Sequence, residues 1–234
     1  MTGVTDLAAD RRHSSAMKIL ALSDMHGDWD CFRPGDLPAA DLVLCAGDLT
    51  EDGRRGGEEA LSRAGNWLRA MGEAYPTVLW IPGNHDIGVT AETFGSQANV
   101  CCALNRTVAV GRGGRTRAAV HGISLCPVFG RPDLAAQFDY ATDDPEVEAA
   151  SCRFEAVDIV LSHCPPRGTL DFWPGGDGHP PKRIGSPALG GYLRRQKPAL
   201  LVCGHVHQAS GRARVGRTLV CNVARRWEII EFEG

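Results

Sequence analysis

Five short loops in this 234-residue chain carry side chains that commonly bind divalent metal ions. Two of the loops hold a pair of these side chains two positions apart, a spacing that lets both point to one side of an extended segment. The other three loops contribute one carboxylate, one amide oxygen and one imidazole. The candidate ligands are Asp24, His26, Asp48, Asn84, His163, His205 and His207. Their types and spacing predict a metal centre.

The number and kind of candidate ligands indicate which chemistry the centre performs. They are more than one divalent ion usually takes from a protein when positions stay open for water and substrate. If one carboxylate bridges, two ions can lie about 3.5–4 Å apart, activate a water and stabilise an in-line displacement at phosphorus. His, Asp and Asn together suit Mn, Fe, Zn, Co or Ni better than Ca, without selecting among them. The residues therefore predict two divalent metal ions and hydrolysis of a phosphate ester.

Each motif also has an ordinary structural explanation when it is taken alone. An Asp-x-His segment after a strand is typical of a turn, and so is the Gly-Asp pair at 47–48. The Gly-Asn-His-Asp segment at 83–86 can form a type I′ turn or an Asx-turn. The functional interpretation depends on all the motifs occurring in order, each directly after an apolar run.

The loops each follow a short apolar run that is rich in Val, Ile and Leu. Runs of this length and composition predict buried strands. In a layered α/β fold the carboxyl ends of the strands lie together, so ligands that are far apart in the sequence converge there. The predicted strands are residues 19–22, 42–46, 78–81, 157–161 and 200–203.

Helices and hairpins are predicted around these strands. Residues 57–74 place apolar side chains at helical spacing, and residues 145–156 and 187–197 are predicted as shorter helices. Residues 107–125, with a Gly-rich turn, and residues 210–232 carry hairpin signals. Strand–helix–strand alternation favours α/β layers. We therefore expect a mixed sheet beside a more antiparallel one, with helices outside.

A segment rich in Pro and Gly, residues 166–185, predicts a long surface loop, and loops of that length are often functional. Its cations can contact a substrate phosphate or form solvated surface. Its aromatic residues can stack on a base or pack locally. The side chains concerned are Arg167, Phe172, Trp173, Lys182 and Arg183. His121, inside a predicted strand, is interpreted as structural.

Taken together, the motifs resemble the signature of the calcineurin-like metallophosphoesterases. The resemblance covers residues 18 to about 223. It implies a four-layer α/β/β/α sandwich with two mixed β-sheets flanked by helices. The matching motifs are Asp24-x-His26, Gly47-Asp48, Gly83-Asn84-His85-Asp86, His163 and Gly204-His205-x-His207.

The resemblance also implies which residue serves which ion, with the Asp48 carboxylate as the bridge. One ion would be held by Asp24, His26, Asp48 and His207. The other would be held by Asp48, Asn84, His163 and His205.

Three further residues receive roles from the same resemblance. His85 is expected to face the substrate, stabilise the phosphoryl oxygens and protonate the leaving alkoxide, tasks that suit a cationic imidazole. Glu51 occupies the position where many members carry an Asp that orients this His, although it can also be a solvated loop acid. Asp86 is expected to support the ligands through hydrogen bonds.

The match to subgroups of the family is uneven. The protein-phosphatase branch has Asp-Arg-Gly after the bridging Asp, whereas residues 48–53 read Asp-Leu-Thr-Glu-Asp-Gly. Residues 161–166, 184–187 and 197–198 are similar to small stand-alone members, including the class III cyclic-nucleotide phosphodiesterase and brain 239-like group. This similarity implies a small phosphodiester substrate. The alternatives are a metal-bearing interaction scaffold with negligible turnover, or a nuclease.

Composition and charge indicate which partners and which cellular compartment to expect. The formal charge of −3 gives no sign of nucleic-acid or membrane binding. The expected partner is the small phosphate-ester substrate that the metal ligands and the resemblance imply. No apolar run reaches the length of a membrane span. Residues 1–16 lack the apolar core of a signal peptide and are expected to be a mobile tail before a metallophosphoesterase domain at 17–234. The nine scattered Cys favour buried free thiols in a reducing cytosol, and hence a cytoplasmic protein.

Overall fold

The structure is a computed structural model that describes residues 16–112, 115–176 and 178–233. The predicted mobile tail lies outside the described residues except for Ala16. Residues 113–114, in the predicted Gly-rich turn, also lie outside them. The elements below are those of the described part of the chain.

The first sheet has five strands in the order β15-β1-β2-β3-β4. Strands β1 (Met17–Leu22), β2 (Leu42–Cys45), β3 (Val78–Trp80) and β4 (Val100–Cys102) run parallel, and β15 (Trp227–Phe232) is antiparallel to β1. Parallel strands end at the same edge of a sheet. The loops after β1, β2 and β3 therefore begin side by side.

The second sheet has six strands in the order β13-β14-β12-β9-β6-β5. Its four central strands are parallel, and each edge is closed by an antiparallel hairpin. The sequence predicted hairpins at residues 107–125 and 210–232, but β15, the last strand of the second region, pairs with β1 in the first sheet. The strands are β5 (Thr107–Arg112), β6 (Arg115–Ile123), β9 (Ile159–Ser162), β12 (Leu200–Cys203), β13 (Gly211–Val215) and β14 (Thr218–Asn222).

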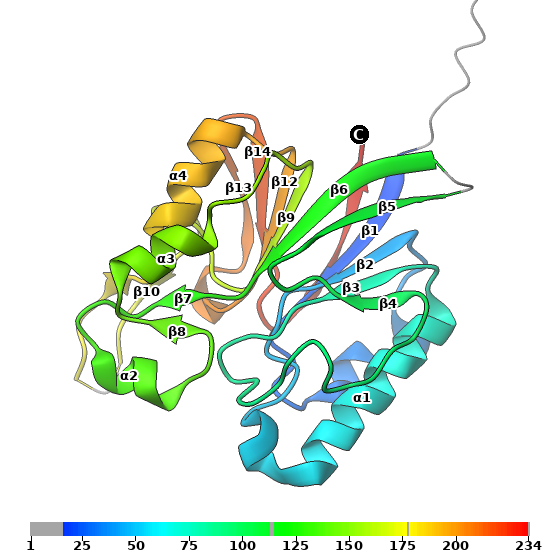
Figure 1. The fold of residues 1–234 in the computed structure, drawn as a ribbon, viewed down its shortest axis with the longest axis horizontal. Coiled ribbons are helices and arrows are strands. Elements are labelled where there is room, and N and C mark those ends of the chain that lie inside the picture. Colours follow the sequence, from blue (N-terminus) through cyan, green and yellow to red (C-terminus); the bar gives the residue numbers. More distant parts are fainter. Residues whose placement is uncertain (1–15, 113–114, 177, 234) are drawn as a thin grey trace, which may run out of the picture.

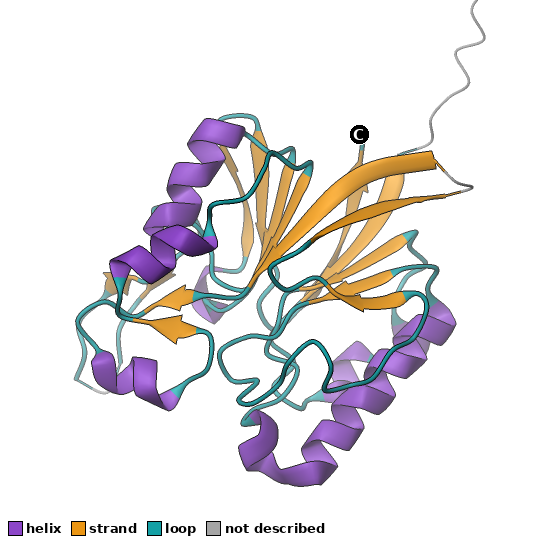
Figure 2. Cartoon of the chain, viewed as in Figure 1, coloured by secondary structure: helices purple, strands orange, loops and turns teal. Residues whose placement is uncertain are grey.

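Helices cover the outer faces of the two sheets (Figure 1). Helix α1 (Gly57–Ala74) packs on the first sheet, and α3 (Pro145–Ser151) and α4 (Pro187–Gln196) lie over the second. Figure 2 shows the resulting succession of helix, sheet, sheet and helix. The expected four-layer α/β/β/α sandwich with two mixed sheets is therefore confirmed.

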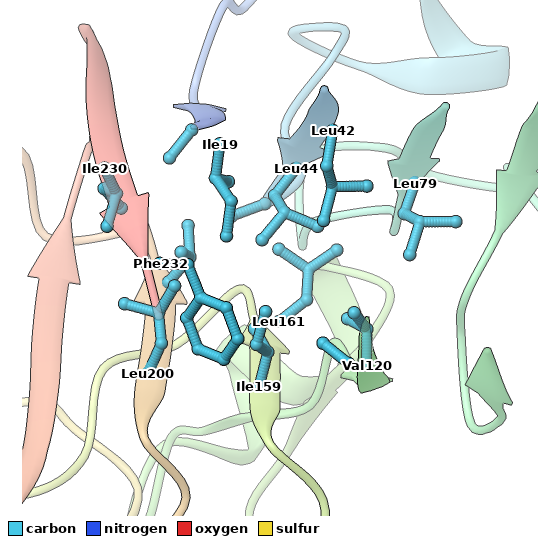
Figure 3. Close-up of a cluster of buried hydrophobic side chains, with 14 of the residues drawn as sticks. Ile19, Leu42, Leu44, Leu79, Val120, Ile159, Leu161, Leu200, Ile230 and Phe232 are labelled. Atoms are coloured by element: carbon cyan, nitrogen blue, oxygen red, sulfur yellow. The ribbon is translucent and has the colours of Figure 1, made fainter. Parts of the chain in front are cut away.

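Burial on both faces explains why the strands are apolar runs. In β1, Ile19 belongs to the core between the sheets, whereas Leu20 packs with α1. In β12, Leu200 belongs to the same central core, whereas Leu201 packs with α4. Figure 3 shows the central core, with side chains from both sheets pointing toward one another. Side chains alternate along a strand, so each sheet contributes to two hydrophobic layers.

The predicted helices agree with the structure except at their ends. Helix α1 spans the predicted residues, but the predicted helices at 145–156 and 187–197 end at Ser151 and Gln196. Lys197 follows with a left-handed backbone (φ 52°), and Pro198 cannot continue a helix.

Several short elements were not predicted, because runs of two to six residues are too short to give a clear periodic signal. Residues 166–185 are not wholly irregular, since they contain a two-stranded ribbon of β10 and β11. The short elements are β7 (Cys126–Pro127), β8 (Ala141–Thr142), β10 (Phe172–Trp173), β11 (Lys182–Arg183) and α2 (Pro132–Gln137). Described 3₁₀ helices are η1 (Trp29–Phe32), η2 (Pro34–Asp36), η3 (Gly53–Gly56) and η4 (His207–Ala209).

Candidate metal centre

The five predicted ligand loops meet at one edge of the molecule. They follow β1, β2 and β3 of the first sheet and β9 and β12 of the second. Backbone hydrogen bonds join them, from Asp24 N to Gly47 O (2.9 Å), from His26 N to Asp48 O (3.0 Å) and from Gly204 N to His163 O (2.9 Å). The structure therefore brings all the predicted ligands together.

One group of ligands surrounds the Asp24 carboxylate. Its Oδ1 lies 3.0 Å from His207 Nε2, and the Nε2 atoms of His207 and His26 are 3.3 Å apart. His26 Nε2 also lies 3.5 Å from Asp48 Oδ2. Two imidazole nitrogens that face each other beside carboxylates are arranged as ligands of a cation.

A second group surrounds the buried His163 ring. Its Nε2 lies 3.0 Å from Asn84 Oδ1 and 3.3 Å from Asp48 Oδ2. Its Nδ1 is 2.7 Å from the Ala46 carbonyl, to which it donates, and this leaves Nε2 as the ligand atom. The His205 ring packs edge-on to it at 5.2 Å. Asp48 Oδ2 therefore stands between the two groups.

Four of the predicted ligands have a left-handed backbone, which non-glycine residues seldom adopt. They are Asp24, His26, Asp48 and His205, with φ between 47° and 67°. Such conformations persist only when the surroundings impose them, and they concentrate at functional sites. The short loops here turn sharply, and candidate ligands from separate loops lie together.

Glycines in the motifs give the carboxylates room. A Cβ at Gly83 would collide with Asp48 Oδ1, and a Cβ at Gly204 would collide with Asp24 Oδ2 and Ser23 Oγ. The glycine that precedes Asn84 and the one that precedes His205 are therefore part of the ligand geometry.

The protonation of the cluster follows from burial and charge. Burial opposes ionisation of Asp24, but hydrogen bonds with His207 and His26 hold its pKa well below the usual value. Burial also opposes protonation of His163, but the Asp48 carboxylate outweighs it and raises the pKa of that imidazole to about 10. Burial, together with the charge of His163, lowers the pKa of His205 to about 4. Carboxylates held ionised in a buried site fit cationic ligands.

His85 lies at the rim of the centre with its side chain 26% exposed. Its backbone N–H donates to Asp48 Oδ1 (2.8 Å), and its Nδ1 lies 2.9 Å from the Glu51 carbonyl. Its ring contacts Phe138, with 4.8 Å between centroids. The imidazole is thus directed by contacts on two sides.

Glu51 lies near His85 but not as the sequence predicted. Its backbone carbonyl, rather than its carboxylate, accepts the hydrogen bond from His85 Nδ1. The carboxylate oxygen Oε1 is 3.7 Å from that nitrogen. The other oxygen, Oε2, is 2.8 Å from His26 Nδ1, although not in line for a hydrogen bond. The carboxylate is 61% exposed and faces two imidazoles.

Asp86 is buried and ties two ligand loops together. Its carboxylate accepts hydrogen bonds from the backbone N–H groups of Leu49 (3.1 Å), Thr50 (2.8 Å) and Gly83 (2.9 Å). Burial, with the nearby charge of Asp48, raises its pKa to about 6. These contacts are those of a positioning residue.

A cavity of about 370 Å³ lies beside the second group of ligands. Asn84 and His205 form part of its wall, and the 166–185 segment contributes Arg167, Trp173 and Lys182. Lys182 Nζ lies 5.4 Å from the Trp173 ring centroid. Cations and an aromatic face therefore border the centre.

Two of the residues singled out in this segment are arranged differently. Arg183 lines the cavity, but its guanidinium pairs with buried Asp171 (2.6 Å). Phe172 is 49% exposed and does not line the cavity.

Two residues near the centre were missed by sequence reasoning, Phe138 beside His85 and Cys126 beside His163. Phe138 carries no sequence signal. Cys126 does, because it follows a predicted strand as the other candidate ligands do.

All nine Cys are free and seven are buried, as expected. Among the described residues, no helix is long and apolar enough to cross a membrane.

Comparisons with known proteins find both sequence relatives and a solved structure of similar fold. Metallophosphoesterase domain-containing protein 1 of Homo sapiens is 25% identical over 231 residues, covering 88% of this chain and 65% of that protein. Probable rhamnogalacturonate lyase C of Emericella nidulans is 26% identical over 206 residues, 84% of this chain but 18% of that protein. The crystal structure of TT1561 of Thermus thermophilus aligns with a TM-score of 0.52 and 15% identity, covering 93% of this chain and 99% of that chain.

The chain thus spans less than two thirds of these two curated relatives. The solved structure supports the fold alone. The family model described as Calcineurin-like phosphoesterase matches residues 17–209, which contain every predicted ligand. The chain therefore belongs to the calcineurin-like phosphoesterase family.

Proposed function

We propose that this phosphoesterase is a dinuclear enzyme that hydrolyses a small phosphodiester. The proposal depends most on Asp48, whose Oδ2 lies 3.5 Å from His26 Nε2 and 3.3 Å from His163 Nε2. A carboxylate oxygen between two separate imidazoles is in the position that a bridging ligand requires. Oxygen and nitrogen donors on both sides of it match the needs of two transition-metal ions.

The donors divide between two ions. Asp24, His26, Asp48 and His207 would hold one of them. Asp48, Asn84, His163 and His205 would hold the other. When bound, such ions supply Lewis acidity and lower the pKa of a water that attacks phosphorus. Mn, Fe, Zn, Co or Ni would suit these donors.

His85 is proposed to act on the substrate. Because its Nδ1 donates to the Glu51 carbonyl, its Nε2 is left for the substrate. In the imidazolium form, the Nε2–H can donate to a phosphoryl oxygen or protonate the leaving alkoxide. The hydrogen bond from its backbone N–H to Asp48 couples its position to the centre. Glu51 and Asp86 are proposed to position the catalytic groups without touching the substrate.

The cavity favours a diester over a monoester. A diester carries a second organic group, and about 370 Å³ of space bordered by Trp173, Lys182 and Arg167 adjoins the ligands. An aromatic face can stack on a ring of that group, and the cations can neutralise its remaining charge.

The test is hydrolysis of bis(p-nitrophenyl) phosphate and p-nitrophenyl phosphate by protein that has been stripped with a chelator and reloaded with Mn²⁺. We expect activity to disappear on chelation, to return with Mn²⁺ and to favour the diester. Asp48→Ala should lose metal and activity, whereas Asp52→Ala, an exposed acid in the same loop, should keep both.

Two other results would contradict the proposal. Equal activity in the Asp48→Ala protein would show that the hydrolysis does not use this centre. Metal binding without turnover of either ester would favour the interaction scaffold instead.

A further inference from the structure

The thiol of Cys126 lies among the ligands of the second group. Its Sγ and one nitrogen each of His163 and His205 are all within 4.8 Å of one another. Cys126 also lines the cavity together with Asn84 and His205. It is buried, at 1% exposure, so it meets the centre and not the solvent.

Cys126 differs from most of the buried Cys because it lies outside the hydrophobic clusters of the described residues. Five of the seven buried Cys belong to one of the three hydrophobic clusters, namely Cys45, Cys102, Cys152, Cys203 and Cys221. Cys126 and Cys164 belong to none of them. Its surroundings include apolar side chains of the cavity wall, such as Phe138, and also the two candidate ligand imidazoles of His163 and His205.

The backbone holds the thiol in place. Cys126 begins β7, which pairs with β8, and its N–H donates to the Tyr140 carbonyl (2.7 Å). Its Sγ lies 3.6 Å from the Ser124 carbonyl, a long contact, and it also interacts with the neighbouring thiol of Cys164. The sulfur can therefore turn toward a cation without breaking a strong hydrogen bond.

The spacing is compatible with one ion. With metal–sulfur bonds of about 2.3 Å and metal–nitrogen bonds of about 2.0–2.1 Å, adjacent ligand atoms lie roughly 3–4 Å apart. Atoms already within 4.8 Å reach that spacing by small side-chain rotations.

We propose that Cys126 is a thiolate ligand of the ion held by His163 and His205, an inference that rests on the proposed metal centre. The S–H proton passes to solvent as the sulfur–metal bond forms. A soft sulfur donor favours Zn²⁺, Co²⁺ or Fe²⁺ over Mn²⁺ and Mg²⁺. The two sites would then differ, with one sulfur-containing and one built from oxygen and nitrogen alone.

Cys164 is the other thiol that must be distinguished. It directly follows His163, but its Sγ is directed to the carbonyls of Pro165 (3.5 Å) and Ile184 (3.6 Å). It does not belong to the group formed by Cys126, His163 and His205. The geometry assigns the ligand role to Cys126 alone.

The test is titration of metal-free protein with Co²⁺, followed by its near-ultraviolet spectrum. We expect two bound ions per chain and a sulfur-to-cobalt charge-transfer band in the wild-type protein. Cys126→Ser should lose the band, whereas Cys164→Ser and the remote Cys152→Ser should keep it. X-ray absorption at the zinc edge should show a sulfur neighbour in wild-type protein, a measurement that does not depend on any variant folding.

The possible failures are distinguishable. Two bound Co²⁺ ions without the band, or a band that survives Cys126→Ser, would overturn the thiolate ligand and leave the dinuclear centre intact. Loss of the band in Cys164→Ser alone would show that Cys164, and not Cys126, supplies the sulfur ligand. Absence of Co²⁺ binding would overturn both proposals.

Discussion

Asp48 connects the two halves of the candidate site to the residue proposed to meet substrate. One of its carboxylate oxygens lies between His26 and His163, and the other accepts the backbone N–H of His85. Its own backbone is left-handed, with φ 51°. We therefore expect substitutions at Asp48 to act on the ligands and on the proposed catalytic imidazole together, and changes at His85 to act on catalysis alone.

Replacement of His85 separates catalysis from metal binding. We expect His85→Gln to load the same amount of metal and to lose turnover by about 10²–10⁴-fold, because proton transfer by a positioned side chain contributes that much. Metal analysis and kcat for the diester measure the two effects. A variant that loses metal in proportion to activity would contradict the assigned role.

A single added methyl group should disturb the first group of ligands. A Cβ at Gly204 would collide with the Asp24 carboxylate, so we expect Gly204→Ala to weaken metal binding, by roughly 10–100-fold if it matches the loss of a supporting hydrogen bond. Equilibrium titration with Zn²⁺ measures the effect. The control is Gly35→Ala, where the added methyl meets nothing within 4 Å. Equal affinity in both variants would refute the steric argument.

The clustering of the candidate ligands could be predicted from the sequence, because each lies in a loop after a strand whose end is fixed by the sheet. Cys126 was missed because a thiol after an apolar run usually means packing. The contact between Glu51 and His85 was misjudged in detail, since a sequence cannot distinguish a carbonyl from a carboxylate on the same residue.

At the scale of elements, strands that are buried on both faces are the most readily predicted. Their apolar runs need no alternation, and β1, β2, β3, β9 and β12 lie within two residues of the predicted bounds. Strand β4 and the short pairs β7–β8 and β10–β11 could not be predicted, because they are held by tertiary contacts rather than by local pattern.

His121 gives the second sheet a predictable pH dependence. It lies in β6, stacks on Phe154 (3.8 Å between centroids) and has Nδ1 2.9 Å from Thr107 Oγ1, as expected of a structural His. Burial lowers its pKa from 6.5 to about 4. Between these values the unfolded chain binds a proton that the folded protein does not bind. The free energy of unfolding therefore falls as pH decreases from 6.5 to about 4.

Replacing His121 should remove this contribution. At about 1.4 kcal/mol per pKa unit, the contribution of His121 amounts to roughly 3.5 kcal/mol at most. Denaturant unfolding at a series of pH values should therefore give a flatter curve for His121→Gln than for wild-type protein. Parallel curves would show that the imidazole is protonated in the folded state.

At the scale of the whole molecule, the candidate centre joins the two sheets. Loops of the first sheet supply Asp24, His26, Asp48 and Asn84, and loops of the second supply His163, His205 and His207. Without cations, these loops hold ionised carboxylates close together in a buried site. Bound ions should therefore stabilise the sandwich as well as activate the substrate.

Metal loading should raise the unfolding temperature. Binding only to the folded state stabilises by about 2.7 kcal/mol when the free ion is about 100 times its Kd. For a chain of 234 residues this corresponds to a rise of roughly 5–10 °C. Calorimetry with Zn²⁺ and with a chelator measures the difference, and Asp48→Ala should show none. An unchanged unfolding temperature in wild-type protein would contradict a buried centre.

The left-handed backbone at Asp48 has a practical consequence for work in cells. Asparagine tolerates that conformation, whereas alanine adopts it at a cost, so Asp48→Asn should keep the loop and the outer surface while removing the charge. Cells that carry this allele would retain any docking role and lack ester cleavage. If cells that lack the protein and cells that carry Asp48→Asn differ in phenotype, the protein has a docking role besides hydrolysis. If the two phenotypes are the same, hydrolysis accounts for the role of the protein.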